Sequence, residues 1–174
     1  MFKESREDSN FDWKDLGNIE DGRPNLGGLV PVSVYRLMQF TLRDILIKKY
    51  SPETADIIFY EAGFSAGTQF CRNVLDKKDS LNDFAANLQK KMKELNIGIL
   101  KIEKMDTKTM DMVFSVEEDL DCSGLPMHDE TVCDYDEGFI AGIFKEYTGV
   151  NFSCKEVDCW ASGARTCRFD IHKI

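Results

Sequence analysis

The stretch TVCDYDEGFIAGIFKEYTGVNFSCKEVDCWASGARTCRFDI, residues 131–171, contains the most informative pattern in the chain. It opens at Thr131 with a pattern that resembles a capping box and starts a helix, and Gly149 ends the apolar run of that helix. Two strands are expected after it, over residues 150–157 and 166–171. This part of the chain is therefore expected to fold as one helix followed by two closing strands.

Hydrophobic periodicity predicts further elements upstream of this stretch. Apolar residues recur at three- and four-residue steps in three segments, and they alternate in two shorter segments separated by a polar turn. Ser51 and Pro52 mark the start of the second helix, as its N-cap and its first helical residue. The expected helices cover about residues 34–50, 52–75 and 80–95, and the expected hairpin pairs residues 97–105 with 109–116.

The charge balance excludes several classes of partner. The chain has 174 residues, with 22 Lys and Arg against 31 Asp and Glu, and a net charge of −9. It lacks the basic face that binding to nucleic acid or to an anionic membrane requires. Its uncharged stretches are far shorter than the roughly 20 residues of a membrane span, and its charged start does not resemble a signal peptide. The sequence predicts a cytoplasmic protein with reduced thiols, no nucleic-acid partner and no membrane partner.

The composition also indicates how the chain is divided. Residues 1–22 are polar and are expected to form an N-terminal arm that docks through Trp13. Glycine and proline follow between Gly22 and Pro31, which is typical of a loop. We expect residues 23–174 to form a single domain.

The cysteines provide the strongest chemical signal. Six are present, and in a reducing compartment a cluster of them indicates metal binding before it indicates disulfides. Cys133 lies at the start of the predicted helix, where the helix dipole favours a thiolate. Cys159 and Cys167 flank a turn, and Glu156 precedes the first of them by three residues. Three thiolates and one carboxylate form a closed tetrahedral set, which predicts a structural Zn²⁺ site.

This ligand set has rivals. Cys154 points to the same face of its strand as Glu156, so it competes for the fourth position. Cys122, in an acidic loop, is a weaker competitor for that position. Simple burial of free cysteines, or their pairing in disulfides, remains a further interpretation of the cluster.

An eight-residue pattern occurs twice. Residues 60–67 and 135–142 both read Y-[ED]-x-G-F-x-A-G. Glycines four residues apart clear one helix face, so that another backbone or a ligand can approach closely. Chance similarity of two helices is the other interpretation of so short a match.

These motifs together resemble the 4-vinyl reductase domain. That family carries a Cys before a G-x-x-x-G helix, followed by E-x-x-C-x(3)-G-x(3)-C-x-F, and residues 61–67 and 25–32 also look like it. The resemblance therefore covers about residues 23–174. The matching positions here are Cys133, Gly138, Gly142, Glu156, Cys159, Gly163, Cys167 and Phe169.

The resemblance implies an α/β (α+β) fold with helices packed on an antiparallel sheet, as in NO-sensing haem domains and vesicle-tethering (Golgi-transport) subunits. In the related sensor domains of phenol-responsive activators, zinc is bound by three Cys and one Glu. Those positions correspond here to Cys133, Glu156, Cys159 and Cys167. The family is taken to bind a small hydrocarbon-like or aromatic molecule and often forms homodimers, and stand-alone archaeal copies look like this chain.

The candidate ligand-binding residues lie on two predicted helices and one predicted strand. The phenol sensors hold their ligand with a His and a Trp, and the corresponding stretches here are apolar, which favours a more apolar ligand. Met side chains adapt well to such pockets, although an apolar stripe of this kind is also typical of plain core. The candidates are Phe84, Leu88, Met110, Met112, Phe114, Phe139 and Ile143.

The sequence thus predicts a domain that binds or senses a small apolar or aromatic molecule and carries a structural zinc ion. One alternative is a reductase, or an accessory protein, that acts on the vinyl groups of tetrapyrroles, although no redox-cofactor motif is visible. Another is an assembly subunit resembling vesicle-tethering proteins. In that case Cys71 is the candidate acyl acceptor.

Overall fold

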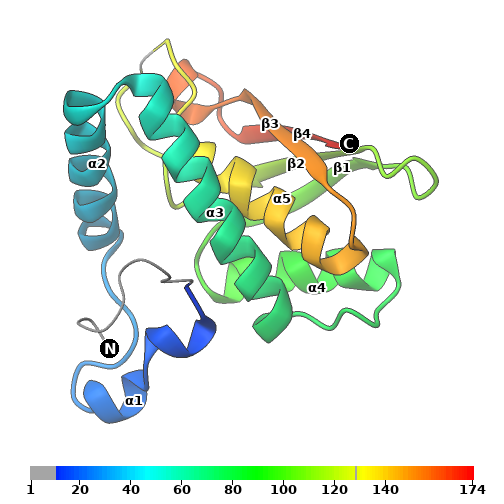
Figure 1. Ribbon diagram of the computed structural model, residues 1–174, viewed down its shortest axis with the longest axis horizontal. Coiled ribbons are helices and arrows are strands. Elements are labelled where there is room, and N and C mark those ends of the chain that lie inside the picture. Colours follow the sequence, from blue (N-terminus) through cyan, green and yellow to red (C-terminus); the bar gives the residue numbers. More distant parts are fainter. Residues whose placement is uncertain (1–10, 128) are drawn as a thin grey trace.

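The computed structural model describes residues 11–127 and 129–174, so residues 1–10 of the predicted arm lie outside the described part. Within it, helices pack on an antiparallel sheet, as expected from the sequence (Figure 1). The helices are α1 (Ile19–Gly22), α2 (Val32–Lys49), α3 (Pro52–Val74), α4 (Leu81–Glu94) and α5 (Asp134–Thr148), with short 3₁₀ turns η1 (Trp13–Leu16) and η2 (Trp160–Ser162). The strands are β1 (Ile99–Met105), β2 (Met112–Glu117), β3 (Phe152–Asp158) and β4 (Cys167–Lys173).

The sheet has the strand order β1-β2-β4-β3, and every neighbouring pair is antiparallel. The last strand therefore joins the two hairpins, and it pairs Phe169 with Phe114 of β2 and with Glu156 of β3. Both phenylalanines are completely buried. This central position of β4 brings its first residue, Cys167, against the loop that follows β2.

Helix α5 lies between α3 and the sheet (Figure 1). Four glycines of the repeated pattern line the contact between α3 and α5. A Cβ atom built on Gly63 would lie 2.0 Å from the carbonyl oxygen of Tyr135, and one on Gly138 would lie 2.0 Å from that of Tyr60. The repeat thus serves the approach of one helix backbone to another, one of the two purposes that the sequence left open.

Local signals explain most helix ends. The Ser51 hydroxyl accepts a hydrogen bond from the Thr54 amide at 3.2 Å, and Gly149 ends α5 with a left-handed φ of 80°. The start of α5 differs from the expectation, since the helix begins at Asp134 and not at Thr131. Cys133 takes the N-cap position without a side-chain capping bond, because its thiol belongs to a buried cluster.

Helix α2 is oriented with its polar side toward the rest of the protein, and it lies at the edge of the molecule beyond α3 (Figure 1). Gln39 is its only buried residue among those described, and its inward side chains make hydrogen bonds rather than apolar contacts. Arg43 pairs with Asp56 of α3 and with Asp134 of α5. The outward side chains are apolar and exposed, namely Val34, Leu37, Met38, Leu42 and Ile45.

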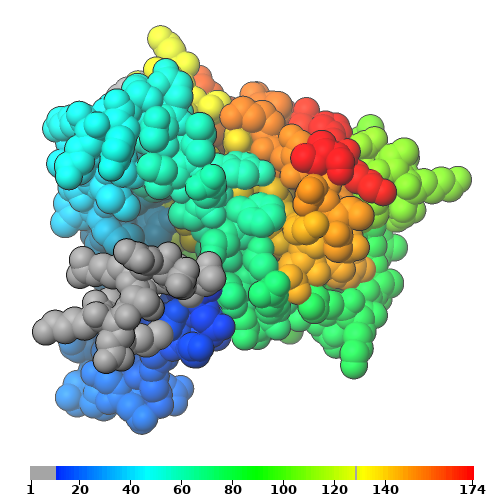
Figure 2. All heavy atoms as spheres, viewed as in Figure 1, coloured from blue at the N-terminus to red at the C-terminus, as the bar shows by residue number. Residues whose placement is uncertain are grey.

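The segment before α2 lies along the same margin as α2, and the space-filling view shows it apart from the sheet (Figure 2). Trp13 of η1 packs against the core, and the Gln69 amide of α3 donates to the Phe11 carbonyl at 3.2 Å. The division at residues 22 and 23 stays a prediction. Among the described residues, no helix is long and apolar enough to cross a membrane.

Candidate metal centre

Four buried cysteines converge from four separate places in the chain. Cys122 lies in the loop after β2, Cys133 is the N-cap of α5, Cys159 follows β3, and Cys167 opens β4. All four are at most 1% exposed. Their sulfur atoms lie within 4.8 Å of one another. The sheet order produces this convergence, because β4 runs between β2 and β3.

The sulfur separations fit a tetrahedral metal site. A Zn–S bond of about 2.3 Å places neighbouring sulfurs of a tetrahedron about 3.8 Å apart. The sulfur of Cys133 lies 3.9 Å from that of Cys159 and 3.7 Å from that of Cys167. The sulfurs of Cys122 and Cys167 are closer, at 3.0 Å, which is still too long for a disulfide bond. All six cysteines of the chain are free.

The electrostatics of the cluster favour a bound cation. Hydrogen bonds from the neighbouring thiols, first that of Cys122 and then that of Cys133, lower the pKa of Cys159. The pKa of Cys133 is raised, chiefly by its sulfur contacts with Cys122 and Cys159 and then by burial. One thiolate is thus stabilised, and the second thiol resists ionising beside it. A divalent cation would remove that resistance by supplying the missing positive charge.

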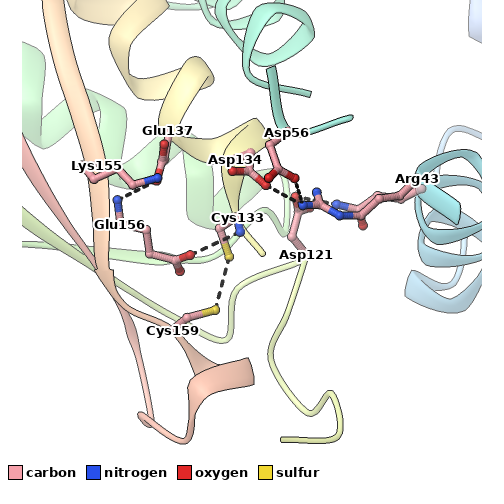
Figure 3. Close-up of polar contacts among 10 residues, drawn as sticks. Arg43, Asp56, Asp121, Cys133, Asp134, Glu137, Lys155, Glu156 and Cys159 are labelled. Carbon is pink, nitrogen blue, oxygen red and sulfur yellow. Dashed lines mark hydrogen bonds and ion pairs between the residues drawn. The ribbon is translucent and has the colours of Figure 1, made fainter. Parts of the chain in front are cut away.

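Glu156 lies beside the cluster, as Figure 3 shows. Its Oε2 atom accepts a hydrogen bond from the Cys133 amide at 3.2 Å, while its Oε1 atom is buried without a partner. Burial, followed by the nearby Cys159, raises the pKa of Glu156 to about 8. The backbone amide of Glu156 donates to Glu137, which pairs with Lys155. This carboxylate is held close to the sulfurs with a free oxygen.

The sequence therefore brought three of the four predicted ligands to the right place, and the structure adds Cys122. Either Cys122 or Glu156 can complete the set with Cys133, Cys159 and Cys167. Cys154 is buried elsewhere on β3 and does not join the group of four sulfurs. The signal for Cys122 is local, because the Asp119 carboxylate accepts hydrogen bonds from the amides of Asp121 and Cys122 and so shapes the loop.

The seven predicted ligand-binding residues divide into two groups. Most form the packed core: Phe84 stacks on Tyr147 with ring centroids 3.8 Å apart, and Phe114 contacts Phe144. Only one of the seven, Phe139, lines a cavity between α2 and α5. The residues that are completely or almost completely buried are Phe84, Leu88, Met112, Phe114 and Ile143, while Met110 is half-buried.

Cys71 is also part of the core. It lies on α3 and is completely buried. Burial raises the pKa of its thiol to about 11, so the thiol is protonated at neutral pH. A protonated, enclosed thiol is a poor nucleophile.

Solved structures share this fold. The phenol-responsive sensory domain of the transcription activator PoxR, solved with phenol, matches with a TM-score of 0.70 and 16% identity over 84% of this chain and 76% of that chain. A trafficking protein particle complex subunit 3 from Naegleria fowleri, covalently bound to palmitic acid, matches with a TM-score of 0.66 and 11% identity, over 82% of this chain and 95% of that one. These likenesses confirm the predicted fold class.

The sequence relationships are more specific. Residues 112–173 match the family model of the vinyl-4-reductase domain. A solved vinyl-4-reductase family protein from Methanocaldococcus jannaschii matches with a TM-score of 0.58 and 18% identity, over 85% of this chain and 84% of that chain. The uncharacterized protein MJ0150 of the same organism is 25% identical over 158 residues, which are 91% of this chain and 84% of the relative. The predicted resemblance to the 4-vinyl reductase domain is thus confirmed.

Proposed function

We propose that this protein is a small-molecule-binding domain of the sensing type, stabilised by one structural zinc ion. The observation that carries the proposal is the convergence of four buried cysteine sulfurs within 4.8 Å of one another. Cys133, Cys159 and Cys167 would hold the ion, with Cys122 or Glu156 as the fourth ligand. Four protein ligands leave no position for water, so the ion would serve structure and not catalysis.

The zinc would tie together parts of the chain that are far apart in sequence. The loop before α5, the start of α5, the end of β3 and the start of β4 all meet at the cluster. Such a tie fixes α5 on the sheet, and α5 in turn carries the glycines that receive α3. Because metal binding to the native state alone adds to folding stability, the holo-protein would be more stable than the apo-protein.

The sensing part of the proposal is supported by the fold and by the family match. The PoxR domain of the same fold was solved with phenol, which is consistent with a small aromatic ligand for this chain as well. The predicted candidates on α4, β2 and α5 are closely packed, so a ligand among Phe84, Met112 and Ile143 would have to displace core side chains. Phe139, by contrast, already faces a cavity.

We also propose that the protein forms a homodimer through α2. Its polar side faces its own chain, and its apolar side is exposed, with Leu37 at 69% and Met38 at 61% exposed. An apolar helix face of this length is typical of an interaction surface. A second copy presents the same face, and two identical faces related by a two-fold axis cover each other fully.

Metal analysis of the purified protein by plasma mass spectrometry tests the zinc proposal. We expect about one zinc ion per chain, and loss or weakening of zinc binding in Cys167→Ser. Glu156→Ala and Cys122→Ser identify the fourth ligand, since only the true ligand should reduce zinc content. Cys71→Ser is the matched control and should keep its zinc. Absence of metal in the wild-type protein would overturn the proposal.

A further inference from the structure

A cavity lies beside the cysteine cluster, between α2, α5 and the loop after β2. It has a volume of about 180 Å³, roughly that of six water molecules in the liquid. Aromatic side chains form part of its wall, with Tyr35 from α2 and Tyr135 and Phe139 from α5. The rings of Tyr135 and Phe139 are nearly parallel, at 14°. Tyr35 is only half-buried, so the cavity reaches the surface.

Two carboxylates, Asp121 and Asp136, complete the wall. Both oxygens of Asp121 have partners, since Tyr35 donates to one at 2.9 Å and Gln39 donates to the other at 2.7 Å. Asp136 is different. It is 9% exposed, and its Oδ2 atom is buried with no hydrogen-bond partner. A buried, unpartnered carboxylate oxygen on a cavity wall calls for a donor from outside the chain.

The positive charges nearby are already used. Arg36 donates to the backbone carbonyls of Leu120 and Asp119, at 2.7 and 3.2 Å. Arg43 is bound between Asp56 and Asp134, as Figure 3 shows. Against them, Asp119, Asp121 and Asp136 are all buried, and the cysteine cluster adds further negative charge on the other side. Buried charges are normally compensated, so this region lacks a cation.

We propose that this cavity binds a small organic ammonium ion, a protonated amine carrying a short apolar or aromatic body. The ammonium group would donate to the Asp136 carboxylate, and the body would lie against the rings of Tyr135 and Phe139. Aromatic faces attract such cations, which adds to the carboxylate contact. The size of the cavity suits a molecule such as benzylamine. The inference deepens the small-molecule part of the proposed function and does not require the zinc.

Calorimetric titration of the full-length protein with benzylamine tests this inference, with benzyl alcohol as the neutral counterpart of the same shape. We expect the amine to bind at least about tenfold more tightly, as hydrogen bonds to charged groups contribute that much. Asp136→Asn should remove this preference, and Asp170→Asn, the same change on β4, should retain it. Tyr135→Leu keeps the carboxylate and should weaken the amine through loss of the ring.

The outcomes are distinct. Equal binding of amine and alcohol, no binding of the amine, or amine binding that survives Asp136→Asn would each overturn the inference. The last result would mean that the cation binds elsewhere on this acidic chain. Zinc content measured on the same samples separates the two proposals. A protein that holds zinc but not benzylamine keeps the metal site and loses this cavity, and the reverse result removes the metal site alone.

Discussion

The contact between α3 and α5 allows a sharp test through Gly67→Ala. A Cβ atom at this position would lie 2.0 Å from the carbonyl oxygen of Phe139 and 2.8 Å from its carbonyl carbon. Real Cβ contacts stay beyond 3.0 Å, so the two helices would have to separate by about 1 Å. The obstructing atoms belong to the backbone, so no side-chain rotation can relieve the clash.

The magnitude follows from two opposing effects. Overpacking of a closely packed contact costs about 3 kcal/mol at the upper end of its usual range. A separation near 1 Å also forfeits a quarter to a half of the dispersion energy across the contact. Alanine stabilises a helix by about 1 kcal/mol relative to glycine. The net loss in the free energy of unfolding is therefore about 2 kcal/mol or more, which lowers Tm by roughly 4–8 °C for a chain of this size.

Thermal and urea unfolding followed by circular dichroism measures this loss. Gly22→Ala is the matched control, because a Cβ atom there meets nothing within 4 Å, and its stability should change by less than about 1 kcal/mol. If Gly67→Ala proved as stable as the wild type or more stable, helix propensity would outweigh the contact. The close approach of the two backbones would then be refuted.

Other perturbations have equally definite outcomes. Removal of zinc by a chelator should lower Tm, and re-addition should restore it, as scanning calorimetry can follow. Phe114→Ala should reduce the free energy of unfolding by about 3–5 kcal/mol in urea titrations, because its ring is completely buried. Leu37→Asp should convert the dimer to a monomer in light scattering, and an unchanged mass would count against the α2 interface. Glu146 accepts hydrogen bonds from Arg72 and Lys77, which lower its pKa below 4.5. Its stabilisation is therefore present at neutral pH and is lost as pH falls through the folded-state pKa. Glu146→Gln should be less stable than the wild type at pH 7, and the difference should vanish in acid.

Local patterns in the sequence predicted most elements closely. The helix expected over residues 52–75 is Pro52–Val74, because Ser51 and Pro52 determine its start regardless of context. The strand expected from residue 109 begins only at Met112. Met110 has a left-handed φ of 64° and belongs to the turn, which alternation of apolar residues does not reveal.

Long-range contacts decided what the sequence left open. The sulfur of Cys122 meets that of Cys167 across 45 residues, and no spacing rule links a loop cysteine to a strand of the other hairpin. The cavity likewise needs Tyr35 and Asp121, which are 86 residues apart.

The apolar stripe of α2 shows the same division. Its period correctly predicted a helix, since periodicity depends only on neighbouring residues. Which way that stripe faces depends on the partners of the opposite side. Arg36, Gln39 and Arg43 find carbonyls and carboxylates on the body of the protein, and those contacts turn the apolar side outward. The sequence by itself thus determined the elements and three of the metal-site cysteines. The tertiary structure decided the fourth sulfur, the exposed face of α2 and the acidic cavity, because each depends on residues that only the folded chain brings together.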